Sequence, residues 1–419
     1  MLHQPRVLCS AAAFTLLLVP AAVAFDENNW PWWRGPAGTG IAAAGQDPPI
    51  EWSENTNVRW KATVPGRGHS SPILVGNQIF LTTADEKDQT QSVVALDRET
   101  GELLWQTQLN RGGFAEKIHS KNTHATPTVA CDGQAVYAVF PNHGRLQLAA
   151  LTLDGEKLWE IDAGPFVPKK YEFGYGPSPL LHGGNVIVAS EFEQGFIAAF
   201  STRDGSESWR IPRTDNTSYS SPIVARIAGR EQMLISGADH VWSFDPLSGT
   251  LLWKEKGTTK ATAGTVVWEG DVVFASGGFP EGQTIAIRAD GSGEILWSNG
   301  VSCYEQSMIA ANGYLYAVND RGIAFCWNGL TGEEMWKKRL GGPISASPVL
   351  ARGNIYATNE MGTTFVFRAS PDEFRLVAEN QLGDETFATP TICGGRIYMR
   401  VASSATGERI ETLYCLDDE

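Results

Sequence analysis

The chain has 419 residues, of which 42% are hydrophobic and 19% charged, and its formal net charge at pH 7 is −14. This apolar content suffices for a large buried core and excludes a disordered chain. The acidic balance, with no run of Lys or Arg, excludes nucleic acid as a partner, because phosphate binding requires clustered positive charge.

Residues 1–24 have the pattern of a secretory signal peptide. Arg6 supplies a positive start, residues 11–19 form an apolar run, and residues 22–24 (Ala-Val-Ala) form a small-residue cleavage site. The run is shorter than the ~20 residues of a membrane-spanning helix. We therefore expect a soluble, exported protein in the periplasm, at the cell surface or outside the cell, with no transmembrane segment.

Residues 25–51 form a Trp-rich extension, with three Trp in four positions at Trp30, Trp32 and Trp33. This segment either packs under the following domain or presents an aromatic patch to a partner. Packing is the preferred interpretation, because exposed Trp clusters of this size are uncommon on monomers.

A phrase that ends in Trp recurs from residue 97 onward. It reads DRETGELLW, DGEKLW, RDGSESW, DPLSGTLLW, DGSGEILW and NGLTGEEMW, ending at Trp105, Trp159, Trp209, Trp253, Trp297 and Trp336. The successive separations of 54, 50, 44, 44 and 39 residues match the period of a β-propeller blade, roughly 40–50 residues. We expect each Trp to bury its ring between adjacent blades, in a structural docking role rather than a sugar-binding one.

A second phrase precedes each of several units: a small residue, then Pro, then an apolar run. Its prolines are Pro72, Pro127, Pro179, Pro222, Pro348 and Pro390. Short alternating segments bounded by Gly and Asn turns lie between the two phrases and predict half-buried antiparallel strands. Each unit therefore has four strands, of which the Pro-led strand is the inner one and the Trp strand the outer one.

The units number eight, and residues 52–419 divide into eight blades of 46 residues. In the seventh blade, at about residues 345–383, PDEFRLV replaces the Trp phrase. The eighth starts at Phe387 and ends after a third strand at residues 412–416, so residues 57–64, which contain Trp60, supply its outer strand. The predicted fold is all-β, an eight-bladed propeller of four-stranded antiparallel blades closed by the mature N-terminal strand, which leaves few exposed edges.

The string ALDRETGELLW resembles the tryptophan-docking motif AxDxxTGxxxW of the quinoprotein alcohol dehydrogenase-like superfamily, with matches at Ala95, Asp97, Thr100, Gly101 and Trp105. Residues 30–419 are similar to the exported bacterial PQQ-binding-like β-propeller repeat proteins. This superfamily includes calcium-PQQ dehydrogenases and non-catalytic scaffolds, one of which helps to assemble outer-membrane barrels. The resemblance implies the fold, whereas activity depends on the site.

The dehydrogenase branch carries adjacent cysteines that form a vicinal disulfide against the cofactor, and no Cys-Cys pair occurs here. Its calcium-binding and catalytic carboxylates have no residue-by-residue match. The resemblance thus leaves PQQ with calcium possible but disfavoured, and no cofactor is assigned. The five cysteines after residue 24, with an odd count and no CxxC, predict small buried residues rather than disulfides or a metal site.

Ligands of a propeller favour the mouth of its central channel. One residue per blade lies three positions before the Pro or its substitute: His69, His124, Gly176, Tyr219, Thr262, Glu305, Ser345 and Phe387. Arg67, Tyr175 and Tyr304 are adjacent to members of this set. The candidate ligand-binding residues at the mouth are therefore His69, His124, Tyr219, Glu305, Arg67, Tyr175 and Tyr304; alternatively, they hydrogen-bond the loops around a water-filled channel. No metal ligand and no catalytic residue is assigned.

Residues 110–123 form the most basic stretch and are expected to overhang the mouth as a loop between blades one and two. The acidic run at residues 290–294 is a turn rather than a calcium loop, because it lacks the twelve-residue spacing.

Two functions follow. The first is a monomeric, non-catalytic exported propeller that binds a protein, peptide or glycan. The second is an enzyme, either a quinoprotein-type dehydrogenase or a hydrolase with its site at the channel mouth.

Overall fold

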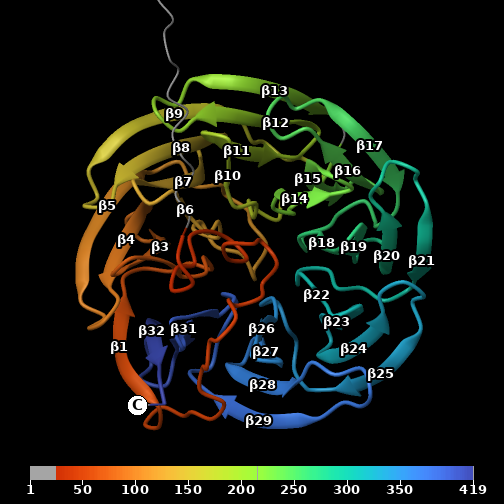
Figure 1. Cartoon of the computed structure of the whole chain (residues 1–419). Helices are drawn as coiled ribbons and strands as arrows, with labels where there is room; N and C mark the ends of the chain where they lie inside the picture. Colours follow the sequence, from red (N-terminus) through yellow and green to blue (C-terminus); the bar gives the residue numbers. More distant parts are fainter. Residues whose placement is uncertain (1–24, 215, 419) are drawn as a thin grey trace, which may run out of the picture.

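The structure is a computed structural model that describes residues 25–214 and 216–418, so the predicted signal peptide lies outside the described residues. Within this part, eight four-stranded antiparallel sheets surround a central axis (Figure 1). The prediction of an all-β, eight-bladed propeller is confirmed. No helix that could cross a membrane occurs in the part of the chain that is described.

Seven blades follow the order of the chain, each from its inner to its outer strand. Blades one to three are β2 (Ile73–Val75), β3 (Gln78–Asp85), β4 (Thr90–Asp97) and β5 (Leu103–Arg111); β6 (Ala130–Cys131), β7 (Ala135–Asn142), β8 (Arg145–Thr152) and β9 (Lys157–Pro165); and β10 (Leu180–His182), β11 (Asn185–Ser190), β12 (Gln194–Ser201) and β13 (Glu207–Thr214). Blades four and five are β14 (Ile223–Ile227), β15 (Arg230–Gly237), β16 (His240–Phe244) and β17 (Leu251–Lys256); and β18 (Val267–Glu269), β19 (Val272–Gly277), β20 (Gln283–Arg288) and β21 (Ile295–Asn299). Blades six and seven are β22 (Ile309–Ala311), β23 (Tyr314–Val318), β24 (Ile323–Asn328) and β25 (Glu334–Arg339); and β26 (Val349–Ala351), β27 (Asn354–Thr358), β28 (Thr363–Arg368) and β29 (Leu376–Gln381).

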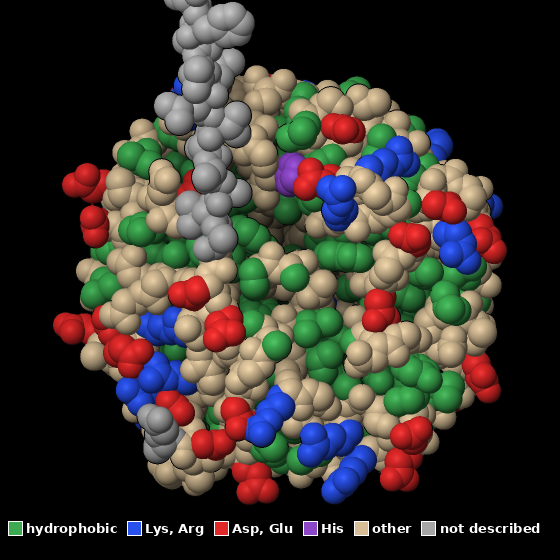
Figure 2. Space-filling model, in the orientation of Figure 1, with side chains coloured by type: hydrophobic (Ala, Val, Ile, Leu, Met, Phe, Trp, Pro, Cys, Tyr) green, Lys and Arg blue, Asp and Glu red, His purple; other side chains and the backbone are tan. Residues whose placement is uncertain are grey.

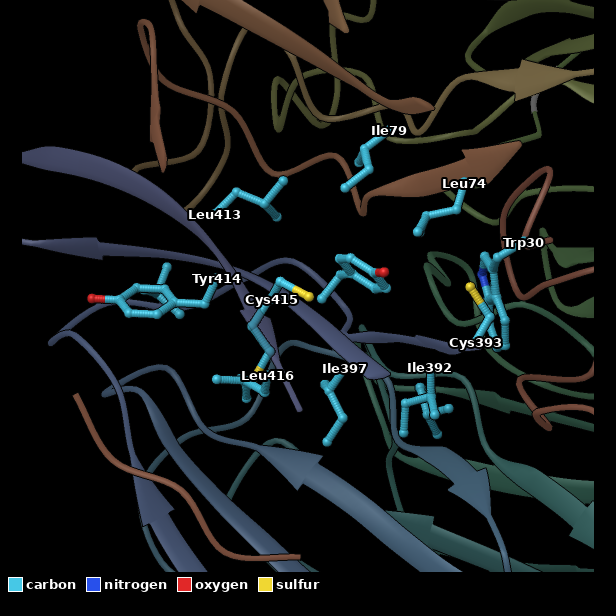
Figure 3. Packing of buried hydrophobic residues seen from close by; sticks show 14 of the residues in the cluster. Trp30, Leu74, Ile79, Ile392, Cys393, Ile397, Leu413, Tyr414, Cys415 and Leu416 are labelled. Atoms are coloured by element: carbon cyan, nitrogen blue, oxygen red, sulfur yellow. The ribbon is translucent and has the colours of Figure 1, made fainter. Parts of the chain in front are cut away.

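Blade eight closes the ring. It combines β30 (Thr391–Cys393), β31 (Arg396–Ser403) and β32 (Ile410–Leu416) with β1 (Val58–Val64), which pairs antiparallel with β32. Figure 3 shows the cluster where blades eight and one meet, with Ile397 and Leu413 facing Leu74 and Ile79. The predicted closure by the N-terminal strand is confirmed, because the strand that lies first in sequence completes the last blade.

Buried ionic contacts reinforce this closure. The Arg400 guanidinium bonds the Glu411 carboxylate within blade eight, and its Nη1 reaches Ser70 Oγ (3.0 Å) and the Thr82 carbonyl (2.8 Å) in blade one. Glu411 in turn accepts the Gly68 N–H at 3.0 Å. Both charged side chains are almost fully buried, so each depends on these partners to offset its desolvation.

The extension, residues 25–51, crosses the centre of the ring (Figure 1). Trp30 forms a β-bridge with Leu74 in blade one, and Ile41 forms one with Leu350 in blade seven. It lies on the face that carries the turns between first and second strands, because Asn29 accepts the N–H of Gly76 in such a turn at 2.7 Å. We call this the extension face and the opposite one, where the inner strands begin, the mouth face. The extension therefore spans the channel axis instead of packing under one blade.

Candidate functional site

A chamber of about 240 Å³ lies on the axis, and residues from all eight blades or the loops that lead into them line it. Because every inner strand starts at the axis, its first residues converge on this space. The lining residues of its wall include Ser71, Thr128, Ser178, Ser221, Thr265, Ser347 and Thr389.

These hydroxyl residues, together with Ser307, form a ring that joins blade to blade. The backbone N–H of one residue donates to the hydroxyl of the next, at 2.9–3.1 Å, in seven links among the described residues. The links run from Ser71 to Thr128, Ser178 and Ser221, and from Thr265 to Ser307, Ser347, Thr389 and back to Ser71. The small residue before Pro is evident in the sequence, but this role is not, because the partner always lies in another repeat.

Trp33 of the extension is the floor of the chamber. Its Nε1–H donates to Thr265 Oγ1 at 2.9 Å, at the gap between the two runs of the hydroxyl ring. The adjacent Arg34 is buried and donates to the carbonyls of Met308 (2.6 Å), Thr39 (2.8 Å) and Pro348 (3.1 Å). The extension thus closes the channel on one side and ties blades five, six and seven together.

Two loops, residues 112–129 and 166–179, narrow the chamber at the mouth face. Lys121 Nζ reaches Glu360 Oε1 of blade seven at 2.6 Å, and Asn122 Nδ2 donates to the Phe173 carbonyl at 2.7 Å. The Tyr219 hydroxyl donates to the Tyr171 carbonyl of the second loop at 2.9 Å. The basic loop therefore overhangs the mouth, where it was expected, and its lysine is paired with a carboxylate.

The structure places four of the seven candidate residues on the chamber wall: His69, Tyr219, Tyr304 and Glu305. Each comes from the stretch just before an inner strand. Among the other members of the predicted ring, Gly176, Ser345 and Phe387 line the chamber as well.

The other three candidates lie elsewhere, which corrects their predicted position. Tyr175 is buried in the core of blades two and three, where its hydroxyl donates to the Ala189 carbonyl at 2.8 Å. His124 stacks on Phe114 with ring centroids 4.1 Å apart. Arg67 pairs its backbone with Ala84 and its guanidinium with Glu86 at 3.5 Å. The loop insertion before blade two and the strand-like backbone of Arg67 turn these side chains from the axis.

Electrostatics differ between the two sides of the chamber. Burial, with Arg67, Arg400 and Arg409 nearby, lowers the pKa of His69 well below 6.5, and its ring stacks on Phe387 at 4.4 Å. Burial, with the Asp320 and Glu360 carboxylates nearby, raises the pKa of Glu305. The histidine and the glutamate thus have different charged surroundings, with arginines near His69 and carboxylates near Glu305.

The side chains that line the chamber do not suit a tricarboxylate quinone such as PQQ. Lys121, already bonded to Glu360, and Glu305 are the charged side chains other than histidine on the described chamber wall, so a polyanion would meet little free positive charge. The volume is also below the roughly 300–1,000 Å³ typical of small-molecule sites. No cluster of three or more potential metal-binding side chains occurs among the described residues.

The Trp residues of the outer strands lie at the seams between blades. Trp60, Trp105, Trp159, Trp297 and Trp336 donate Nε1–H to a backbone carbonyl of the next blade, at 2.8–3.0 Å. Trp209 packs on Gly249 of the next blade, but its buried Nε1 has no partner. Trp253 instead donates to Gln232 of its own blade at 2.7 Å. The repeats therefore differ in how this residue is hydrogen-bonded.

Comparisons with known proteins agree with this architecture. A family model described as outer membrane protein assembly factor BamB matches residues 35–166 and 89–338. The chain is 24% identical over 355 residues to outer membrane protein assembly factor BamB of Yersinia pestis, covering 80% of this chain and 82% of that protein.

Solved structures show the same fold at low identity. The crystal structure of BamB from Moraxella catarrhalis superposes with a TM-score of 0.61 at 15% identity, covering 85% of this chain and 96% of that one. A europium-containing methanol dehydrogenase superposes with a TM-score of 0.68 at 10% identity, covering 94% and 98%.

Proposed function

The chain belongs to the family described as outer membrane protein assembly factor BamB, and from this premise we propose that it is an exported, non-catalytic propeller that binds a protein partner. The observation that carries the proposal is the axial chamber. Its floor is a Trp, its hydroxyls hold neighbouring blades, and its lysine is paired. Polar groups engaged in this way support a scaffold better than a reaction.

The proposed location is the periplasm, at the inner side of the outer membrane, after removal of residues 1–24. Relatives named as outer membrane protein assembly factors support this location. The partner class we favour is a protein or peptide rather than a glycan, because the proteins with the same family description are assembly factors. We propose a monomer, since the ring is closed within one chain.

The competing function is a dehydrogenase or hydrolase at the chamber. A general base must lie within hydrogen-bond reach of its acid or substrate, and His69 and Glu305 have different neighbours. His69 Nε2 is buried without a hydrogen-bond partner among the described residues. His69, Tyr219, Tyr304 and Glu305 are retained as the residues that would contact a small ligand if one enters.

Two measurements test the proposal. In the native host, chemical cross-linking of the tagged chain should capture a reproducible envelope protein, which mass spectrometry identifies. Purified protein with PQQ and calcium should then give no dye reduction with alcohols or sugars. Dye reduction that disappears in Glu305→Gln, without a cross-linked partner, would overturn the proposed function.

A further inference from the structure

An open sector of the extension face, a groove of about 250 Å³, lies on blades three and four. Trp32 and Trp33 of the extension line one side, and Leu180, Leu181, Ile223 and Val224 of the inner strands β10 and β14 line the other. In Figure 2 hydrophobic side chains lie beside and below the hollow near the centre of this face, and a histidine with charged side chains lies at its upper edge.

The extension itself shows how a peptide binds on this face. Trp30 N–H donates to the Leu74 carbonyl at 2.8 Å, and Leu74 N–H donates back to the Trp30 carbonyl at 2.9 Å. On blade seven, Leu350 receives the N–H of Ala42 (2.8 Å) and donates to the carbonyl of Gly40 (3.0 Å). Both contacts add a short extended segment to the free edge of an inner strand.

Leu181 and Val224 occupy the same place in their repeats as Leu74 and Leu350. All four are the second residue after the inner-strand proline. Leu74, Leu350 and Leu181 each face the residue five positions on, at Ile79, Ile355 and Val186. Val224 faces Met233 and lies two residues further from its turn, which leaves it at the same point of the alternation. Because hydrogen bonding alternates along antiparallel strands, the N–H and C=O of Leu181 and Val224 point toward the free edge, as those of Leu74 do.

The exposed fraction of the side chain distinguishes Leu74 and Leu350 from Leu181 and Val224. Leu74 is 0% exposed and Leu350 7%, beneath the extension, whereas Leu181 and Val224 remain half-buried. The backbone hydrogen bonds between the extension and the inner strands involve blades one, two and seven in the described structure, and none involves Leu181 or Val224. An unpaired strand edge next to an apolar wall is a template for an added strand.

We propose that the open sector binds a short, extended, apolar segment of a partner protein, which pairs with the edge of β10 or β14 as Trp30 pairs with β2. This inference deepens the proposed function and rests on it. The backbone of the segment forms the two-bond bridge at Leu181 or Val224, and its apolar side chains lie against Trp32 and Trp33. A second copy of this chain is a poorer occupant, because Trp30 and Ile41 are already paired within their own ring.

The probe is a fluorescein-labelled peptide of alternating Val and Thr flanked by Lys, titrated into the full mature chain at physiological salt. A second peptide of the same sequence carries N-methyl groups on alternate backbone nitrogens. We expect saturable binding of the first peptide, a change in Trp fluorescence, and at least roughly tenfold weaker binding of the second, because an N-methyl group removes the N–H that the peptide donates and places a methyl group against the strand edge.

The variants Leu181→Arg and Val224→Arg place a charge in the groove, and the double variant should weaken binding at least tenfold. Leu158→Arg is the matched control, because Leu158 is 55% exposed near the start of the outer strand β9, away from the groove. This variant should bind the peptide as the wild type does. Melting temperatures near that of the wild type show that the variants fold.

Equal binding of the two peptides, or wild-type affinity in the double variant, would overturn the proposal. Self-association abolished by Leu181→Arg would overturn it in favour of a second copy. The two experiments can fail separately. If only the assignment of the groove is wrong, the peptide does not bind there, but cross-linking still captures an envelope protein through another surface.

Discussion

The hydroxyl residues at the start of six of the eight inner strands each make two contacts with neighbouring blades among the described residues. Ser71 donates its backbone N–H to Thr128 Oγ1 at 3.0 Å, and its Oγ accepts the Thr389 N–H at 3.1 Å. The residues inside the two runs are thus both donors and acceptors between neighbouring blades, whereas Ser221 accepts only from blade three and Thr265 Oγ1 accepts from Trp33 instead of a neighbouring blade. A small side chain is required because larger ones would fill the chamber, and a hydroxyl is required because Ala would leave a buried N–H without a partner.

His69 makes the stability of the protein sensitive to acid. At pH values above 6.5 its ring is neutral in both folded and unfolded chains. Below 6.5 the unfolded chain takes up the proton first, because burial and nearby arginines lower the pKa of His69 in the fold. Stability should therefore fall by up to about 1.4 kcal/mol per pH unit between 6.5 and the folded pKa.

We expect His69→Phe, which keeps the stack on Phe387, to lose less stability between pH 7.5 and pH 5.0 than the wild type does. The measurement is the melting temperature of both proteins at the two pH values. An identical decrease in both proteins would show that other groups cause the acid sensitivity.

At the scale of the element, β1 differs from the other outer strands because it joins the ring from the opposite end of the chain. It is attached through its ladder to β32 and through Trp60, whose Nε1 donates to the Arg98 carbonyl at 3.0 Å. The ring of Trp60 also packs on Gly101, where φ is +75° and an added Cβ would lie 2.5 Å from the indole. The Trp phrase thus needs Gly both for its turn and for this close approach.

Trp60→Ala should open the closure between blades eight and one. We expect destabilisation of about 3 kcal/mol and faster trypsin cleavage at Arg59 and Lys61, because β1 separates from β32 more often. Urea unfolding and limited proteolysis measure the two effects.

Trp159→Ala is the matched control for this prediction. Trp159 bonds the Thr202 carbonyl at 3.0 Å and packs on Gly205 in the same way, so its loss should cost a similar free energy. Trp159 lies on β9, however, the outer strand of blade two, and the chain continues directly from this strand into blade three. Its loss should therefore leave β1 paired with β32 and resistant to trypsin. Equal cleavage of the two variants at β1 would contradict closure by this strand.

At the scale of the whole molecule, the extension connects blades that are distant around the ring. It contacts blade one through Trp30, blade five through Trp33 and blade seven through Ile41. Because it crosses the axis, it restrains the ring against opening at any single seam. The cores of the blades are otherwise separate clusters that meet only their neighbours.

Arg34 should contribute most to this restraint. Its buried guanidinium bonds three carbonyls, and burial lowers its pKa to about 9, so it stays charged near neutral pH. We expect Arg34→Ala to destabilise the protein by about 3 kcal/mol, as measured by urea unfolding.

Arg352→Ala is the comparison for Arg34→Ala. Arg352 also joins blade seven to the extension, through an ion pair with Asp47, but both side chains are mostly exposed. Its loss should cost about 0.5 kcal/mol or less. Similar effects of the two substitutions would argue against a central role for the extension.

Much of the fold could be predicted because its signals are local and repeated. The spacing of the Trp phrases indicated the blade period, and the alternation around Trp60 indicated the closing strand. Candidate site residues could be predicted only in part. His69, Tyr304 and Glu305 line the chamber, whereas Tyr175, which precedes Gly176 as Tyr304 precedes Glu305, lies in the core of blades two and three and donates to the Ala189 carbonyl. Sequence position alone does not separate these two tyrosines.

The amino-acid sequence by itself determined the number of blades, the four strands in each and the strand that closes the ring, since these depend on short-range periodicity. Only the tertiary structure decided what the axis holds. Trp33 meets Thr265, and Lys121 meets Glu360, across more than 200 residues of chain. Such contacts depend on which repeats face one another in the closed ring, and periodicity carries no information about that. The repeat pattern therefore predicts a propeller, whereas its closed chamber and open sector follow from the path of the extension across it.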